Sequence, residues 1–510
     1  MIRKIRKIAF SRLFIVGVAI VMQLALFFVM LSNLNEYSTI FNTVMRIVSF
    51  LVIVSIVNRN MVVEAKIPWI IIVLLLPLFG TAMYLAFSEY RMSKKQRKLF
   101  SQINENIVKN FKDEMSQRHA IIEEAGEYGG LCNYIINTTL NLPFKNTNTK
   151  FYPDGSLFFD ALLDELKNAQ KFIFMEYFII ASGIMWDSIL DILIQKIRQG
   201  VEVRIMYDDL GSVSTLKYNF DKKLSETGIK CIKFHPFIPI VSEAHNNRDH
   251  RKITVIDGKC AFIGGANISD EYINKNNRID GYWKDSAIKI RGEAVKSVTA
   301  MFMHMYGTQL GKSDDYSTYL CKGEKLDNEK GIVIPFGDGP RPAYTEHVSE
   351  NVILNMISTA EKYIWITTPY LIIDDKLTNA LCSSALRGVD VRIVTPHIPD
   401  KKTIFAITHS YYQRLQNKGI KIFEYTPGFI HSKQIVCDDK IAVVGTVNLD
   451  YRSLVHHYEC GVVLINTDTF FDIKDDFCNI FECSTDMKDF KQNKIIAMLC
   501  RFCSAFTPLL

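Results

Sequence analysis

Two copies of one short polar pattern stand far apart in this chain of 510 residues. Each copy reads H-x-K-x4-D and is followed, at the same interval, by an asparagine. The two sets are His250, Lys252, Asp257 and Asn267, and His431, Lys433, Asp438 and Asn448. A pattern with this many fixed positions seldom recurs by chance, so the recurrence favours a functional motif.

The residue types in the two copies are those that cleave a phosphodiester bond. One histidine can attack phosphorus while the other protonates the leaving oxygen. Lysines and asparagines can bind the phosphate oxygens as charge builds in the transition state. Side chains two apart on a β-strand point the same way, so the histidine and lysine of each copy share a face. We therefore predict a catalytic set made of both complete motifs, with phosphate contacts from Asn267 and Asn448.

Within that set we expect the two motif aspartates to have a structural role. Asp257 and Asp438 stand an odd number of positions from their histidines, so on a strand they face away from them. We expect each to cap a turn or to pair across its lobe. Gly264, Gly265 and Gly445 predict a tight turn at which the backbone approaches a ligand closely.

A histidine nucleophile needs an acceptor for its second ring nitrogen, which fixes the tautomer. Glu459 opens the strand that follows the second asparagine, and Asp285 holds the comparable place in the first copy. We expect Asp285 to orient His250 and Glu459 to orient His431. The alternative is that each is a solvated carboxylate at a strand end.

The duplication extends beyond the motifs. Four blocks recur in order, beginning with FIFMEYFII and YIWITTPYLII, and each copy alternates β-branched runs with amphipathic stretches. This alternation predicts an α/β fold with mixed sheets flanked by helices. We expect two pseudo-symmetric lobes, at 151–311 and 324–483, packed face to face. Because each lobe carries half of one chemical set, the site should lie between them.

The region 1–90 reads as a membrane anchor with three apolar segments. Leu13–Leu31 and Ile67–Phe87 are long enough to span a bilayer, whereas Arg46 interrupts Ile40–Val57. Basic residues precede the first segment and follow the third, and the positive-inside rule places both flanks in the cytoplasm. We predict two full spans before cytoplasmic lobes, with Ile40–Val57 re-entrant or interfacial.

Two further stretches flank the lobes. Residues 91–150 read as a polar, partly helical connector along the membrane. Residues 484–510 form an amphipathic segment that lies on the membrane surface or packs as a terminal helix. The net charge of +6 is concentrated near the N-terminus, which favours an anionic membrane over nucleic acid as a partner. The close cysteine pairs lack further ligands at zinc spacing, so we predict no metal site.

The paired motifs resemble those of the phospholipase D superfamily and, more narrowly, those of bacterial cardiolipin synthases. The narrower resemblance rests on HNNRDHRKITVIDGKCAFIGGANISDEY, the WKD segment, TTPYLIIDD, GFIHSKQIVCDDKIAVVGTVNLDYRSL, Glu459 and the closing TPLL. It covers the chain from about Ile67 to the end. Two departures stand out: Asp249 replaces an asparagine that is usual before the first histidine, and SAIKI replaces the more typical T-H-L-x-I.

The resemblance implies a transferase of the bacterial cell membrane that needs neither cofactor nor metal. A phosphatidyl group passes from one phosphatidylglycerol to another through a phosphatidyl-histidine, giving cardiolipin and glycerol. The resemblance implies His250 as nucleophile and His431 as general acid and base. A membrane-bound phospholipase D or a phosphatidylserine synthase would use the same histidines with another acceptor. The sequence leaves acceptor, acyl-chain preference and oligomeric state open.

Overall fold

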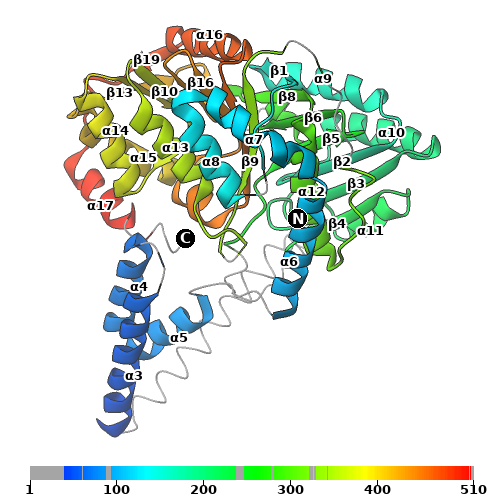
Figure 1. Ribbon diagram of the computed structural model, residues 1–510. Coiled ribbons are helices and arrows are strands. Elements are labelled where there is room, and N and C mark those ends of the chain that lie inside the picture. The colour runs from blue at the N-terminus through cyan, green and yellow to red at the C-terminus, as the bar shows by residue number, and fades with distance from the viewer. Residues whose placement is uncertain are drawn as a thin grey trace, which may run out of the picture.

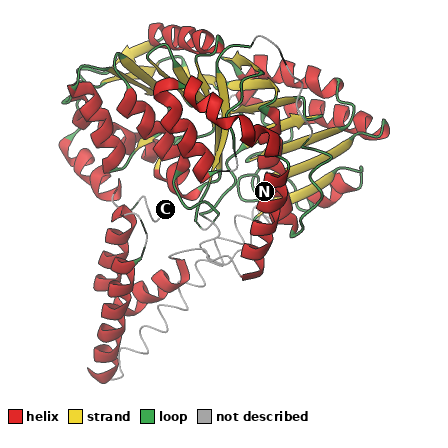
Figure 2. Cartoon of the chain, in the orientation of Figure 1, coloured by secondary structure: helices red, strands yellow, loops and turns green. Residues whose placement is uncertain are grey.

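The computed structural model describes residues 39–59, 61, 63–87, 94–139, 141–236, 246–276, 279, 281–320, 326, 329–341, 343–504 and 506. Two mixed sheets flanked by helices form the bulk of the chain, and a group of apolar helices projects from one end (Figure 1). The expected two-lobed α/β architecture is therefore what the chain adopts. Figure 2 shows the sheets inside the lobes and most helices on their outer faces.

The first lobe is built on a seven-stranded sheet in the order β1-β8-β6-β5-β2-β3-β4. Strands β2, β3 and β4 are parallel to one another, and the others pair antiparallel. Its elements are β1 (Thr147–Tyr152), α9 (Gly155–Lys167), β2 (Phe172–Tyr177), α10 (Ile184–Arg198), β3 (Glu202–Asp208), α11 (Phe220–Ser225), β4 (Lys230–Phe234), β5 (Lys252–Ile256), β6 (Cys260–Gly264), η3 (Asp270–Ile273), β7 (Tyr282–Lys284), β8 (Ala287–Gly292) and α12 (Val295–Leu310).

The second lobe repeats the plan on an eight-stranded sheet in the order β19-β13-β12-β10-β15-β16-β18-β9. Strands β10, β12 and β13 are its parallel part. Its elements are β9 (Ile332–Asp338), α13 (Val348–Thr359), β10 (Tyr363–Thr367), β11 (Leu371–Ile372), α14 (Asp375–Leu386), β12 (Asp390–Pro396), α15 (Lys402–Gln416), β13 (Lys421–Tyr425), β14 (Gly428–Ile430), β15 (Gln434–Cys437), β16 (Ile441–Gly445), β17 (Leu449–Asp450), η4 (Arg452–His456), β18 (Glu459–Ile465), α16 (Thr469–Glu482), β19 (Ser484–Asp486) and α17 (Lys494–Ser504).

Local sequence signals set the corresponding helices of the two lobes. Asp374 caps the start of α14 by accepting a hydrogen bond from the Leu377 N–H at 2.9 Å. Gly200 and Gly388 follow α10 and α14 with φ of +88° and +97°, a left-handed conformation that favours glycine. In both lobes, therefore, a glycine in the left-handed conformation ends the helix and connects it to the next parallel strand.

The two lobes share one apolar core. Helix α12 is buried from Val295 to Gly307, and it packs where side chains of both sheets meet, including Ile253 and Val255 from β5 and Val436 from β15. A helix that is buried all round belongs to a core rather than to a surface. The strands that carry the motifs therefore lie at the junction of the lobes.

The stretch expected as a connector contains α6 (Lys94–Lys109), α7 (Lys112–Glu124), η1 (Gly126–Tyr128) and α8 (Gly129–Thr138). Ile103 and Ile107 of α6 join the core around α12, and Leu131 and Ile135 of α8 pack in the second lobe. These helices are thus integral to the folded lobes, which the polar composition of the segment did not indicate.

The projecting helices are α3 (Thr39–Asn58), α4 (Val63–Leu75) and α5 (Pro77–Phe87). They pack together through a small core in which Trp69 and Tyr84 meet edge to face at 5.5 Å. Proline has no N–H to continue a helix, and the third apolar segment divides before Pro77 into α4 and α5. Within the part of the chain that the structure describes, no helix combines the length and hydropathy needed to cross a bilayer. The expected span Leu13–Leu31 lies outside the described residues.

Candidate active site

The first motif meets the second lobe through its backbone. The His250 N–H donates to the Tyr458 carbonyl at 2.9 Å, and the Tyr458 N–H donates to the Arg248 carbonyl at 2.8 Å. This short parallel pairing sets the residue after Tyr458 beside the imidazole. The Nδ1 of His250 lies 2.9 and 3.1 Å from the two carboxylate oxygens of Glu459.

The second motif meets the first lobe in the corresponding way. Strand β14 pairs parallel with β7, and the His431 N–H donates to the Lys284 carbonyl at 2.7 Å. The residue after Lys284 is Asp285, whose Oδ2 lies 2.6 Å from the Nδ1 of His431. Each histidine is therefore held by a carboxylate from the other lobe.

This crossed arrangement corrects the expected pairing. We expected Asp285 to orient His250 and Glu459 to orient His431, because each carboxylate follows its own motif in sequence. The structure joins His250 to Glu459 and His431 to Asp285. The reason is that the residues just before the carboxylates, Lys284 and Tyr458, pair with the motif segment of the other lobe, which the sequence of a single lobe does not reveal.

Both carboxylates are fully buried and are held by neighbours of their own lobe. Glu459 accepts hydrogen bonds from the hydroxyls of Thr446 and Ser453. Asp285 accepts from the Ser286 N–H at 2.8 Å. Burial raises the pKa of Glu459 to about 7 and that of Asp285 to about 6, because a charged carboxylate is poorly solvated in the interior.

The glycines of the motif turns serve this packing. A side chain at Gly265 would collide with the Asp285 carboxylate, and one at Gly445 would collide with the backbone of Cys460 and Gly461. We expected these glycines to let the backbone approach a ligand. Their close neighbours are instead the adjacent strand and the carboxylate that orients His431.

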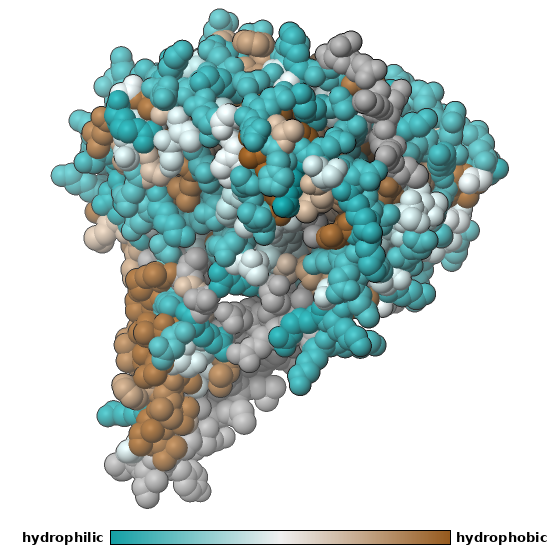
Figure 3. Space-filling view, in the orientation of Figure 1, coloured by the Kyte–Doolittle hydropathy of each residue, from teal (hydrophilic) through white to brown (hydrophobic). Residues whose placement is uncertain are grey.

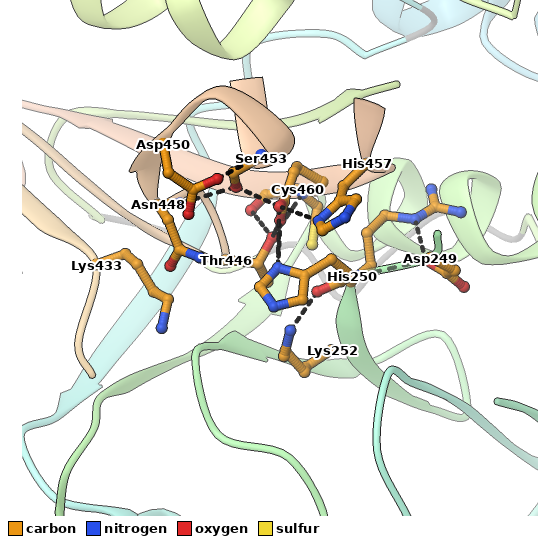
Figure 4. Close-up of polar contacts among 12 residues, drawn as sticks. Asp249, His250, Lys252, Lys433, Thr446, Asn448, Asp450, Ser453, His457 and Cys460 are labelled. Carbon is orange, nitrogen blue, oxygen red and sulfur yellow. Dashed lines mark hydrogen bonds and ion pairs between the residues drawn. The ribbon is translucent and has the colours of Figure 1, made fainter. Parts of the chain in front are cut away.

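Lys252 and Lys433 are buried beside the histidines, and each ammonium donates to the carbonyl of the histidine two residues earlier. Burial lowers the pKa of Lys252 to about 8 and that of Lys433 to about 7. Figure 4 shows Lys252 and Lys433 extending from different segments toward the region of His250. Two cations from the two lobes thus serve one centre.

Burial lowers the pKa of both histidines well below the usual range, and the lysines act in the same direction. A neutral imidazole that donates from Nδ1 to a carboxylate keeps a lone pair on Nε2, which is the form a nucleophile needs. His431 also lowers the pKa of His250, so the two rings lie within electrostatic range of each other.

The motif aspartates lie at the far ends of their strands. The Asp257 carboxylate accepts from the N–H groups of Gln170, Lys171 and Phe172 at 2.7 to 2.9 Å. Asp438 accepts in the same way from Glu361, Lys362 and Tyr363. Each carboxylate therefore fixes the start of the neighbouring parallel strand, β2 or β10. The two aspartates face away from the histidines, as the odd spacing predicted, and their contacts are structural.

The two asparagines have different contacts. The Asn267 amide donates to the Tyr272 hydroxyl at 2.6 Å, and its carbonyl accepts from the Ile179 N–H at 3.0 Å. The Asn448 carbonyl oxygen is buried and has no hydrogen-bond partner among the described residues. Asn448 lies on the Lys433 side of the centre in Figure 4. The identical sequence spacing thus conceals two different environments.

Sequence reasoning missed the aromatic groups beside each imidazole. His431 lies against three rings, with centroid distances of 5.4 to 5.8 Å, from Tyr272, Trp283 and Phe429. His250 lies 5.0 Å from Phe178 and 5.4 Å from a third histidine, His457. The available signal was spacing: Trp283 and His457 each stand two residues before an orienting carboxylate.

His457 is largely buried, and neither ring nitrogen has a hydrogen-bond partner among the described residues. Its Nδ1 lies 3.8 Å from Glu459. Together, His250, His457 and Glu459 bring three atoms able to ligate a metal within 4.8 Å of one another. This group was not expected from sequence.

Asp249, the departure noted before the first histidine, is fully buried. Its carboxylate accepts weakly from Arg251, whose guanidinium also pairs with Glu176 at 2.6 Å. The aspartate therefore belongs to a buried ion-pair group behind the motif, on the side away from Lys252.

Comparison with known proteins identifies relatives of this sequence. The family model described as "Cardiolipin synthase, PLD-like domain" matches residues 162–306 and 353–482, and "Phospholipase_D-nuclease N-terminal" matches 47–89. Cardiolipin synthase 2 of Bacillus cereus is 35% identical over 422 residues, covering 82% of this chain and 81% of that protein. The cardiolipin synthase of Halalkalibacterium halodurans is 32% identical, covering 87% and 88%.

The fold also has a counterpart among solved structures. The phosphatidylserine synthase of Haemophilus influenzae superposes with a TM-score of 0.55 over 76% of this chain and all of that chain. Their sequence identity is 14%, so the similarity concerns the fold.

Proposed function

Because the chain belongs to the family of cardiolipin synthases with phospholipase D-like domains, we propose that it converts two phosphatidylglycerols into cardiolipin and glycerol. The family makes it a phosphatidyltransferase. The observation that carries the proposal is the crossed centre, in which each lobe supplies one imidazole and the carboxylate that orients the other.

In the first step, the Nε2 of His250 attacks the phosphorus of one phosphatidylglycerol. The bond between phosphorus and the glycerol oxygen breaks, and His431 gives that oxygen a proton. A bound phosphodiester raises the pKa of a nearby imidazole through its negative charge, which lets His431 act as the acid despite its burial. The products are free glycerol and a phosphatidyl-His250.

In the second step, neutral His431 takes a proton from a headgroup hydroxyl of a second phosphatidylglycerol. The hydroxyl oxygen attacks phosphorus, the bond from phosphorus to nitrogen breaks, and cardiolipin leaves. Both steps use the same two histidines in exchanged proton states, as microscopic reversibility requires.

The carboxylates stabilise the charge that appears on the rings. When His250 bonds to phosphorus its ring becomes cationic, and the Nδ1–H donates to Glu459, which Thr446 and Ser453 hold in place. Asp285 gives the same support to His431 when that ring carries the transferred proton.

Phosphate binding is assigned to Lys252 and Lys433, with Asn267 and Asn448 as neutral donors. Asn267 has to share or exchange its hydrogen bond to Tyr272 to do so. The lysines carry the larger part, because a protonated lysine in a buried site offsets the phosphate charge directly.

We place the protein at the cell membrane with its lobes in the cytoplasm. Support comes from the projecting helices α3–α5, whose exposed side chains include Phe50, Leu51, Leu74 and Leu85. Figure 3 shows hydrophobic surface gathered over these helices, whereas the visible face of the lobes is largely hydrophilic. Extracting a lipid from a bilayer costs about 0.8 kcal/mol for each buried CH2. A site tethered at the membrane can reach both lipid substrates without extracting them.

The test is product analysis with the full chain in proteoliposomes that contain phosphatidylglycerol. Thin-layer chromatography should show cardiolipin, with one free glycerol released for each. Phosphatidic acid as the sole lipid product would replace the proposal with a hydrolase. A product that appears only when serine is added would replace it with a phosphatidylserine synthase.

A further inference from the structure

The C-terminal helix α17 presents an apolar face that nothing in the described chain covers. Ile495, Met498, Leu499 and Phe502 follow helical spacing along one face, and each is more than half exposed. An exposed apolar stripe of this size on a short helix indicates a surface that contacts a membrane or another apolar surface.

The opposite face of α17 fixes the helix to the second lobe. Cys500 is buried against Ile372 and Ile407, the latter on α15. Gln492, just before the helix, donates to the Ala406 carbonyl at 2.9 Å. The apolar stripe therefore has a fixed orientation, away from the lobe.

A polar cavity of about 560 Å³ lies between α15 and α17, and Arg501 of α17 forms part of its wall. Arg414 and Lys418 line it from the side of α15. Arg414 pairs with Asp375 at 2.9 Å, whereas Lys418 and Arg501 have no carboxylate partner among the described residues. The cavity is therefore positively charged and suited to a phosphate group.

The position of α17 favours a bilayer over a protein as the occupant. In Figure 1, α17 lies at the end of the second lobe from which α3–α5 project. Burial raises the pKa of Tyr451 in the second lobe, and the Glu64 carboxylate at the start of α4 adds to that rise, so this end of α4 lies near the lobe. An amphipathic helix with basic neighbours, beside apolar helices, matches the surface of an anionic membrane.

We propose that α17 lies in the interface of the membrane and that the cavity lined by Arg414, Lys418 and Arg501 binds the phosphate headgroup of an anionic lipid. This lipid is distinct from the substrate at the histidines. Its site holds the second lobe against the bilayer, so that the lobe junction stays near the plane of the substrates.

The test measures thiol labelling of the full chain in lipid nanodiscs. Met498→Cys places a thiol on the apolar stripe. The internal reference is the exposed Cys478 on α16, which lies at the end of the lobes away from α3–α5 in Figure 1. Peptide mass spectrometry follows both thiols during reaction with a water-soluble maleimide. Discs of phosphatidylcholine are compared with discs that also contain phosphatidic acid, which is a phosphomonoester and so not a donor of the proposed reaction.

We expect labelling of residue 498, relative to Cys478, to slow about tenfold when phosphatidic acid is present. K418E together with R501E should abolish that slowing, since each basic residue near an anionic surface contributes about fivefold to binding. The matched control K222E with K223E reverses the same charge on exposed α11 and should leave the slowing intact.

Equal relative labelling in both kinds of disc would overturn the proposal. Slowing that survives K418E with R501E would also overturn it, because the cavity would then have no part. Slowing that depends on the number of chains in a disc, rather than on lipid charge, would assign the stripe to a second copy. The readout is independent of turnover, so it does not depend on the product that the histidines make.

Discussion

Glu459 in the second lobe accepts a hydrogen bond from the Nδ1 of His250 in the first lobe, at 2.9 Å. The imidazole and the carboxylate that orients it therefore come from different halves of the duplicated sequence. His431 and Asp285 repeat the relationship in the opposite direction at 2.6 Å. A single lobe contains neither complete pair.

Glu459→Gln tests this relationship. The amide keeps the shape but removes the charge that stabilises an imidazolium, and it can donate to the ring and favour the wrong tautomer. We expect turnover to fall by at least about 100-fold with no loss of folded protein, measured as glycerol release and by circular dichroism. Glu482→Gln, at the exposed end of α16, is the matched control and should retain turnover. Normal turnover of the Glu459 variant would show that the carboxylate does not support the reaction.

The pH dependence follows from the two orienting carboxylates and from Lys433. Asp285, with a pKa near 6, and Glu459, with a pKa near 7, must be ionised to support His431 and His250, so activity rises as pH increases through about 6 to 7. Lys433, with a pKa near 7, must be protonated to bind phosphate, so activity falls as pH rises beyond about 7. The profile of kcat/KM should therefore be bell-shaped within roughly pH 6 to 8.

Lys433→Arg separates the two limbs. An arginine stays protonated throughout this range, so the alkaline limb should move upward while the acid limb stays in place. If the alkaline limb of this variant's residual activity stays in place, that limb belongs to another group. Lys252 is then the first candidate, because its pKa is about 8.

Gly265→Ala probes the packing behind His431. The added methyl group meets the Asp285 carboxylate and must displace it from the imidazole. We expect turnover to drop by one to two orders of magnitude, in line with the loss of an orienting contact at a catalytic group. Gly130→Ala on α8, where an added Cβ meets nothing within 4 Å, should behave as wild type. Equal activities for the two variants would be inconsistent with the described turn.

The group His250, Glu459 and His457 predicts sensitivity to added zinc. Two imidazoles and a carboxylate are a familiar zinc donor set, and a bound ion would engage His250. We expect added Zn²⁺ to inhibit the enzyme and EDTA to reverse the inhibition. His457→Asn removes one ligand and should raise the inhibitory concentration about tenfold. Identical zinc sensitivity in both proteins would show that the ion acts elsewhere.

The sequence predicted much of this molecule because the information was local. The strands β5 and β15 and the outward Asp257 and Asp438 follow from spacing and residue type. The crossed carboxylates could not be derived, since they depend on two pairings across the junction, β7 with β14 and Asp249 with Tyr458. His457 was missed for the same reason: its role as a neighbour of His250 exists only once the lobes are joined.

The central claim is that both imidazoles act on one phosphorus. Turnover of phosphatidylglycerol by His250→Ala, His431→Ala and the double variant, each in proteoliposomes, tests it most directly. If the two histidines act as a unit, each single variant loses essentially all cardiolipin formation and the double variant is no worse. Substantial turnover by either single variant, or losses that multiply in the double variant, would contradict the account.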